Sequence, residues 1–345
     1  MYNENNLWHM EIEYNFKKIF EACRIQASDI IPEIEYAGNF NGCTIEGLTD
    51  KPAPAFPYGG IVGVKGQAKS GKSTFVQIAV ASILGKLDYG ISPMKKPQRV
   101  YLIDTEQMTK DTLTNLQRIL KLSKAEEDNI QVVNIRRESC EYRYLFFFDL
   151  MEKVIPKDEY CIVVLDGISD LMQDINNNIE SSNLMNAILK TMDEHRNCCL
   201  ILLLHQNPNA DENGKMRGVI GTSILNKCDE TWLVKTDGYT FTATKTTSRH
   251  SGQGQPINFY FDEKGDVKSS ARPIHIEDDK KLKNWLKTKE YLDKEIYSFS
   301  EIREKIKEAE NLSERSAENR LKEYVSRAFI RKEGKKYIVN KNQQI

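Results

Sequence analysis

The sequence predicts an α/β protein in which a mostly parallel sheet is wrapped by helices, followed by a small C-terminal domain. Short apolar runs alternate with helical stretches from residue 59 to about residue 267, the pattern of strands joined by crossover helices. These runs are nearly continuous in Val, Ile and Leu, as expected for strands covered on both faces. After about residue 276 the chain becomes polar and highly charged, which indicates a separate domain.

Residues 1–53 are predicted to form a helical segment and a linker. Apolar residues there are spaced to make one stripe on a helix, which packs either on its own domain or on a neighbouring subunit. These residues are Ile12, Phe16, Ile19, Phe20 and Cys23. The proline-rich stretch 51–57 cannot continue a helix, so we expect a connector there.

The core domain is predicted to span residues 54–275. Its expected parallel strands are 60–64, 99–104, 130–135, 161–166 and 200–205. Three later runs, 230–235, 239–246 and 257–261, alternate more in polarity and are joined by Asp-Gly and Lys-Gly turns. These runs are typical of hairpins, so we expect them to extend one edge of the sheet.

The loop after the first core strand carries a phosphate-binding motif. The stretch GQAKSGKS has Gly66, four residues, and then Gly71, Lys72 and Ser73, which matches G-x-x-x-x-G-K-[ST]. Consecutive backbone N–H groups of such a loop face nucleotide phosphates, the lysine reaches the β and γ phosphates, and the serine hydroxyl binds Mg²⁺. The sequence therefore predicts a site for ATP and Mg²⁺. Its predicted phosphate-binding residues are Gly66, Gln67, Ala68, Lys69, Ser70, Gly71, Lys72, Ser73 and Thr74.

Two acidic residues at strand ends are candidates for the chemistry of this site. Asp166 ends the apolar run CIVVLD, the position of a carboxylate that helps to hold Mg²⁺, although an acid there can also simply cap a helix. Glu106 follows the strand RVYLID and is our candidate for the base that activates water. A first-turn helix acid is the alternative for Glu106.

A polar segment follows the strand 200–205. His205 or Gln206, at the tip of that strand, could sense the γ-phosphate and move the loop behind it. The loop contains Lys215 and Arg217, which could contact a nucleic-acid backbone. A strand-end histidine whose hydrogen bonds are merely structural is the competing interpretation.

The C-terminal segment 276–345 is predicted to form a winged-helix domain with three helices and a basic hairpin. Net charge is −1 over the whole chain, but residues 315–345 carry 9 Lys or Arg against 3 Asp or Glu. This excess favours DNA as the partner, and a protein-contact module is the alternative. The candidate DNA-binding residues here are Arg315, Asn319, Arg320, Lys322, Arg331, Lys332, Lys335 and Lys336.

Taken in order, GQAKSGKS, LIDTEQ, IVVLDG and LLLHQNPN resemble the core of the RecA-type P-loop ATPases. Among these, the chain is most similar to the RepA-like hexameric replicative helicases of plasmids and other mobile elements. The resemblance spans residues 54–267. It implies that Lys72 and Ser73 bind phosphate and magnesium, that Asp166 supports the metal and that Glu106 activates water. It also implies a homo-oligomer, a ring or filament that takes single-stranded DNA through its core loops.

The stretch TATKTTSRHSG resembles the segment in which these enzymes carry basic residues that reach a neighbour's nucleotide. Lys245 and Arg249 would then be fingers that act across a subunit interface. An exposed basic strand end is the alternative. The fourth element also departs from the RepA-like pattern, because two histidines stand there in the family and His205-Gln206 stands here.

Other classes fit less well. A partitioning ATPase carries a second lysine five positions before the motif lysine, where this chain has Gln67. Two functions remain: an ATP-driven DNA helicase or translocase, and an ATP-switched regulator or loader that binds duplex DNA through its winged helix without unwinding it. Strand displacement would distinguish the first from the second.

The cysteines and the N-terminus bear on the compartment. Seven cysteines are scattered and never form C-x-x-C, which argues against a disulfide framework and favours a reducing cytosol. The first residues, MYNENNLWHM, lack a basic region followed by an apolar run, so no signal peptide is expected. We therefore expect a cytoplasmic protein.

Overall fold

The computed structural model describes residues 33–40, 53–85, 89–207, 216–252, 255–262, 264–270, 284–285, 287–326, 330–334 and 336–339. The chain divides into two compact units, Met1–Glu35 and Tyr36–Ile345, and residues 33–35 are the described part of the first. The helix predicted around residues 12–23 lies outside the described residues. Within the described ranges, no helix is both long enough and apolar enough to cross a membrane.

Nine strands form one large sheet, in the order β12-β11-β10-β9-β3-β8-β7-β5-β6. Six of them, from β9 to β6 in that order, run parallel, and β10, β11 and β12 extend the sheet with antiparallel pairing. This confirms the predicted α/β class with a mostly parallel sheet. The strands are β3 (Ile61–Gly66), β5 (Arg99–Asp104), β6 (Ile130–Asn134), β7 (Cys161–Asp166), β8 (Cys198–His205), β9 (Glu230–Thr236), β10 (Phe241–Ser248), β11 (Ile257–Phe261) and β12 (Val267–Ser270).

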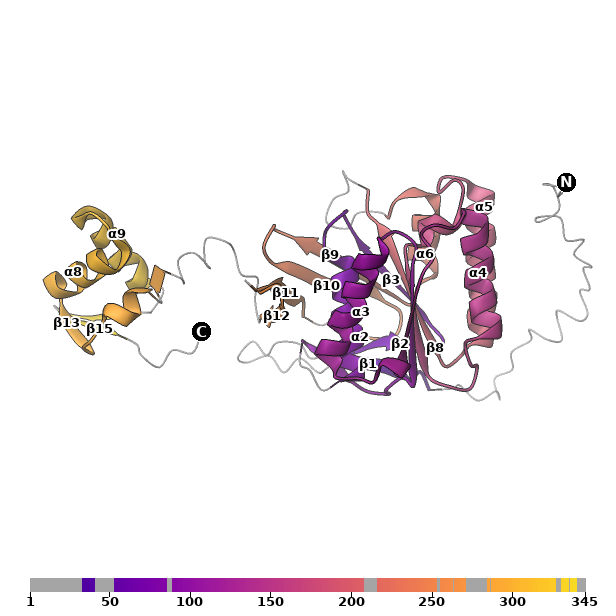
Figure 1. Cartoon of the computed structure of the whole chain (residues 1–345), viewed down its shortest axis with the longest axis horizontal. Coiled ribbons are helices and arrows are strands. Elements are labelled where there is room, and N and C mark those ends of the chain that lie inside the picture. Colours follow the sequence, from indigo (N-terminus) through magenta and orange to yellow (C-terminus); the bar gives the residue numbers. More distant parts are fainter. Residues whose placement is uncertain are drawn as a thin grey trace, which may run out of the picture. The chain divides into compact units, whose positions relative to one another are not determined.

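Helices cover both faces of this sheet (Figure 1). Helices α2 (Lys72–Leu84) and α3 (Thr109–Ser123) pack on one face. Helices α4 (Cys140–Lys153), α5 (Asn178–Glu194) and α6 (Gly218–Lys227) pack on the other. Two short 3₁₀ turns, Glu127–Asn129 and Ile168–Leu171, precede β6 and follow β7.

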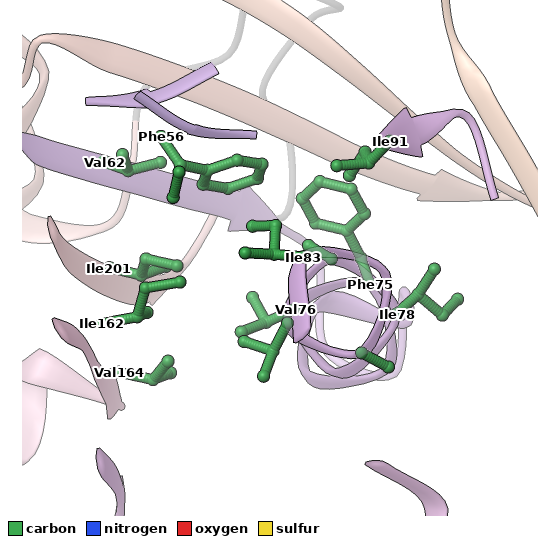
Figure 2. Packing of buried hydrophobic residues seen from close by; sticks show 14 of the residues in the cluster. Phe56, Val62, Phe75, Val76, Ile78, Ile83, Ile91, Ile162, Val164 and Ile201 are labelled. Carbon is green, nitrogen blue, oxygen red and sulfur yellow. The ribbon is translucent and has the colours of Figure 1, made fainter. Parts of the chain in front are cut away.

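Alternating side chains of each strand supply the two apolar layers. Val62, Val164 and Ile201 point toward α2, where they meet Val76 and Ile83 (Figure 2). Their strand neighbours, among them Val163 and Leu202, belong to the layer under α4 and α5. The sheet is thus buried on both sides, which explains why its strands read as continuous apolar runs.

A second, small sheet contains residues that the sequence predicted to be a connector. β1 (Tyr36–Phe40) pairs antiparallel with β2 (Ala53–Pro57) and with β4 (Ile91–Pro93). Residues 53–57 of the proline-rich stretch therefore form a strand rather than a linker. Proline cannot donate to a ladder, but β2 lies at the edge of its sheet and needs only one partner. Its Phe56 stacks on Trp232 with ring centroids 5.6 Å apart, so β2 packs on the large sheet.

The C-terminal residues form a small module with its own apolar core. It contains β13 (Ile296–Ser298), α8 (Phe299–Glu310), α9 (Glu314–Ser326), β14 (Ile330–Glu333) and β15 (Lys336–Val339), and residues 287–291 are helical. β15 pairs with both β13 and β14. A capping box starts α8, because Ser298 and Glu301 bond to each other's backbone N–H groups there.

Candidate functional site

Four parallel strands end at one edge of the large sheet and bring the predicted site residues together. β3, β5, β7 and β8 end at Gly66, Asp104, Asp166 and His205. Gly66 pairs with His205 across one strand boundary, and Asp104 pairs with Asp166 across another. Because the carboxyl ends of parallel strands share an edge, residues distant in sequence meet here.

The phosphate-binding loop follows β3 and needs glycine at two positions. A Cβ on Gly66 would lie 2.4 Å from the Ser70 hydroxyl and from a backbone carbonyl of β9, so no side chain fits. Gly71 has φ of +87° and caps α2, and a Cβ there would lie 2.5 Å from the Phe241 ring. Both glycines of the motif are thus required by backbone geometry and close packing.

The start of α2 has the features of an anion site. Gly71, as N-cap, offers no side-chain acceptor to the first N–H groups of the helix, so these donors are available to a ligand. The Ser70 hydroxyl is buried and has no hydrogen-bond partner among the described residues. A cradle that excludes side chains, free helix donors and an unsatisfied hydroxyl together fit a phosphate group.

Lys72 is the first residue of α2, and its ammonium is held inside the loop. Its Nζ donates to the carbonyls of Gly66 (3.2 Å) and Gln67 (3.0 Å) and lies 3.1 Å from Nδ1 of His205. Burial lowers the pKa of Lys72, and the carboxylates of Asp166 and Glu106 oppose this shift. Both carbonyl contacts are to the loop itself, so the ammonium is placed to exchange them for phosphate oxygens.

Ser73 and Asp166 form a close pair beside the loop. The Ser73 hydroxyl donates to Oδ2 of Asp166 over 2.5 Å. Desolvation raises the pKa of Asp166 to about 6; the bond from Ser73 opposes this shift, and the charges of Glu106 and Asp104 add to it. A hydroxyl and a carboxylate are hard oxygen ligands of the kind that Mg²⁺ takes alongside phosphate, so the pair fits a magnesium ion.

Glu106 lies next to His205 on the other side of the loop. Its Oε2 is 3.4 Å from Nε2 of His205. That contact holds the pKa of Glu106 below its usual value; desolvation opposes the shift, and the charge of Lys72 supports it. Gly167 makes room for the acid, because a Cβ at that position would lie 2.5 Å from its Oε1. His205 therefore joins Glu106 to Lys72 through its two ring nitrogens.

Sequence reasoning missed several supporting residues. Asp104 accepts the backbone N–H groups of Glu106 (3.1 Å) and Gln107 (2.9 Å), so it shapes the turn that presents the acid. Thr105 donates to Asp170 over 2.9 Å and accepts the N–H of Gly167, which ties this turn to the end of β7. The signal was present in the sequence as polar residues directly after strand ends, but the partners of Thr105 lie 62 and 65 positions away.

The predicted sensor residues and the loop behind them are placed as follows. His205 has its side chain in the site, as described above. Gln206 is buried, and its backbone N–H bonds to the carbonyl of Gly66 over 2.9 Å. Arg217 is exposed, and its backbone N–H bonds to the carbonyl of His205 over 2.8 Å. Lys215 lies outside the described residues.

Lys245 does not have the geometry of a finger. Its side chain is 0% exposed, its Nζ donates to the carbonyl of Pro54 and to Ser251, and Glu230 lies 3.9 Å away. A buried ammonium with these bonds ties β10 to β2 and β9 and is not available to a neighbouring subunit. Arg249 is exposed, and its guanidinium donates to the backbone carbonyls of Cys228 and Asn226.

The C-terminal candidates for DNA contact fall into two groups. Those that are exposed are Arg315, Asn319, Lys322, Arg331, Lys332 and Lys336, and Lys335 lies outside the described residues. Arg320 is an exception to the predicted outward set. Its guanidinium is ion-paired with Glu310 (2.8 Å) and Glu323 (2.9 Å), because α9 turns it toward the end of α8.

No protein-family model matches the sequence. No curated protein matches it either. Among solved structures, the chain is similar to the RadB recombinase, with 15% identity and a TM-score of 0.45 over 63% of this chain and 93% of that one. It is also similar to a KaiC-like protein from Pyrococcus horikoshii OT3 (15%, 0.42, 63% and 92%). A third is the flagellar accessory protein FlaH from Methanocaldococcus jannaschii (15%, 0.42, 63% and 92%). Identities this low transfer no residue's role to this chain.

Proposed function

We propose that the chain is a RecA-type, RepA-like ATP hydrolase that works as a DNA helicase or translocase and assembles into a homo-oligomer. One observation supports the hydrolase activity. Five side chains from the ends of four strands meet around a loop that excludes side chains: Lys72, Ser73, Asp166, Glu106 and His205. Phosphate binding, metal binding and water activation need these groups in one place. The resemblance of its motifs to this family supports the oligomer and the motor.

In the proposed reaction, the loop N–H groups and the Lys72 ammonium bind the β and γ phosphates of ATP. Ser73 and Asp166 would hold Mg²⁺, which when bound adds positive charge at the same phosphates. Glu106 accepts a proton from the attacking water as the water oxygen bonds to the γ-phosphorus and the bond to the bridging oxygen breaks. ADP and inorganic phosphate result. Because His205 contacts both Lys72 and Glu106, it is placed to respond when phosphate leaves.

Magnesium-dependent nucleotide binding is expected to weaken in acid because of Asp166. A metal ligand must be deprotonated, and the pKa of this carboxyl is about 6. The carboxylate is fully formed above pH 7, so the Mg²⁺ midpoint for binding a fluorescent, non-hydrolysable ATP analogue should be constant there. Below pH 6 it should rise about tenfold per pH unit.

Asp166→Asn separates this effect from titration of the nucleotide, whose terminal phosphate also ionises near pH 6. The variant should need more Mg²⁺ at every pH and should retain only the nucleotide's own pH dependence. If wild type and variant gave parallel curves from pH 5 to 8, Asp166 would have no part in metal binding.

The DNA partner is proposed on the basis of two described surfaces. The backbone N–H of Arg217 bonds to the carbonyl of His205, so Arg217 lies close to the proposed ATP site. A DNA strand bound beside Arg217 would therefore lie next to the nucleotide. In the C-terminal module, Arg331, Lys332 and Lys336 are exposed on the β14–β15 hairpin and Arg315 and Lys322 are exposed on α9. Basic groups on a hairpin beside a helix suit contacts to duplex phosphates, so we propose that the module is a winged helix.

The test of this function is ATP hydrolysis measured without DNA, with single-stranded DNA and with duplex, together with strand displacement and native mass. A motor predicts DNA-stimulated hydrolysis that weakens with salt, and displacement by an oligomer. Duplex binding with slow hydrolysis and no displacement would instead indicate a regulator or loader.

Charge removal on the hairpin tests the C-terminal contact. Replacing Arg331, Lys332, Lys335 and Lys336 by alanine should weaken duplex binding and reduce the salt dependence of affinity by several phosphate contacts, with basal hydrolysis unchanged. The matched control removes four exposed lysines of the core: Lys96, Lys124, Lys190 and Lys227. Equal loss of affinity in both variants would point to a nonspecific charge effect and away from the hairpin.

A further inference from the structure

One side chain beside the magnesium pair has no role in the mechanism above. Gln107 directly follows Glu106, and its Nε2 lies 3.3 Å from Oδ2 of Asp166 and 3.4 Å from the Ser73 hydroxyl. The same Asp166 oxygen already accepts the Ser73 hydroxyl. An amide that donates to this oxygen therefore contacts both groups that would hold the metal.

The orientation of this amide is set by a chain of hydrogen bonds. Oε1 of Gln107 accepts from Nδ2 of Asn115 over 2.9 Å, and Oδ1 of Asn115 accepts from Nη1 of Arg118 over 3.4 Å. A guanidinium can only donate, so Asn115 must turn its oxygen toward Arg118 and its NH₂ toward Gln107. Gln107 must then turn its own NH₂ toward Asp166. Arg118, which can only donate, thus fixes the orientation of both amide groups. The series of hydrogen bonds ends on the carboxylate of Asp166.

Arg118 is itself held in place. Its Nη1 donates to Oε1 of Gln77 over 2.6 Å, and its guanidinium lies over the Phe261 ring at 5.3 Å from the centroid. Gln77 is buried on α2, the helix that begins with Lys72 and Ser73. No carboxylate among the described residues pairs with Arg118. The series of hydrogen bonds therefore starts at Gln77 on α2, passes through Arg118 and Asn115 on α3, and ends at the pair of Ser73 and Asp166.

We propose that Gln107 is a positioning residue that holds Ser73 and Asp166 in their metal-binding arrangement, with its amide oriented by Asn115 and Arg118. This inference rests on the proposed function, since it assigns a role toward the same magnesium ion. Gln107 acts through Ser73 and Asp166 and need not touch the metal. Residues that orient metal ligands in this way commonly change metal affinity when they are replaced.

The physical effect is on the carboxylate. The N–H that Gln107 donates to Oδ2 holds this oxygen beside the Ser73 hydroxyl, so the carboxylate keeps one orientation toward the metal position. The amide also donates toward the Ser73 oxygen, which limits rotation of the hydroxyl. Gln107 thus opposes rotation of the carboxylate and rotation of the hydroxyl, the two movements that would separate the pair.

Gln107→Met tests the role, because methionine keeps the length of the side chain and removes the donor. Beside these residues lies a cavity of about 40 Å³, lined by Ser73, Asp166, Gln107 and Asn115 among others, so the thioether can be accommodated. We expect the Mg²⁺ midpoint for binding a fluorescent, non-hydrolysable ATP analogue to rise roughly tenfold. Analogue affinity without Mg²⁺ and the midpoint of thermal unfolding should stay close to wild type. Gln117→Met, on the exposed face of α3, is the matched control and should change none of these values.

Asn115→Leu supplies the second arm. It removes the group that orients Gln107, so it should raise the Mg²⁺ midpoint in the same direction by a smaller factor. The double variant should resemble Gln107→Met alone, because both changes act on one chain of bonds. Independent, multiplying effects of the two changes would contradict the orienting role.

The outcomes also separate this inference from the proposed function. If wild type binds the analogue with no dependence on Mg²⁺, the proposed magnesium site is wrong. If wild type depends on Mg²⁺ and Gln107→Met has the same midpoint, the site stands and the role of Gln107 is overturned. A Gln107→Met variant that shifts only thermal unfolding would show a purely structural residue, which likewise overturns it.

Discussion

Lys72→Ala is expected to abolish ATP hydrolysis, with a turnover number at least roughly 10²–10³-fold below wild type. The change removes the ammonium that the loop holds beside the carbonyls of Gly66 and Gln67 and beside His205. In the proposed reaction this charge offsets the negative charge that develops on the transferred phosphoryl group. Steady-state release of phosphate at saturating ATP and Mg²⁺ measures the loss.

The fold should survive this substitution. Lys72 is the first residue of α2, where a shorter side chain leaves the helix and its apolar contacts in place. Circular dichroism and thermal unfolding should therefore match wild type closely. Lys96→Ala, an exposed lysine of the core away from the loop, is the matched control. Full residual activity in Lys72→Ala would remove the loop from the reaction.

Glu106→Gln is expected to slow hydrolysis by roughly 10²–10⁴-fold and to leave ATP trapped on the protein. The pKa of Glu106 is held below its usual value by the contact with His205, so the side chain is an ionised proton acceptor at neutral pH. The amide has nearly the same shape but cannot accept a proton from water. Phosphate binding depends on other residues, so affinity for ATP with Mg²⁺ should be retained.

Single-turnover hydrolysis beside equilibrium ATP binding separates these two effects. Glu138→Gln removes an exposed acid elsewhere on the core and should behave as wild type. A variant that lost binding as well as turnover would place Glu106 in nucleotide binding. Unchanged turnover would exclude it as the base.

Much of this site could be predicted because its residues lie in short sequence motifs at the ends of apolar strands. The strand 99–104 and the strand 161–166 have the predicted bounds, since each is an apolar run that ends on an aspartate. The phosphate-binding loop was equally local, because its spacing and its glycines follow from backbone geometry alone. Parallel strands then place these ends on one edge, so Ser73 meets Asp166 across 93 positions of sequence.

What could not be predicted depends on partners that no local pattern identifies. In the sequence, Lys245 is a basic residue in a polar strand, so it was predicted to be accessible. The fold buries its side chain and brings Glu230 and the carbonyl of Pro54 to its ammonium group. Arg320 reads as outward until Glu310, on the preceding helix, pairs with it. The two prolines of β2 predicted a linker because the edge position that tolerates them is a property of the sheet.

The order of strands in the large sheet has a consequence for synthesis on the ribosome. β3, which precedes the phosphate-binding loop, pairs with β8 and β9. It pairs with none of the strands β4 to β7, which lie between β3 and β8 in the sequence. Its partners are therefore made only after residues 198–205 and 230–236. At typical elongation rates of about 5–20 residues per second, the strand waits roughly 7–28 s for its first neighbour. Both edges of β3 stay unpaired during that interval, so a nascent chain of this protein is exposed to aggregation until β8 emerges.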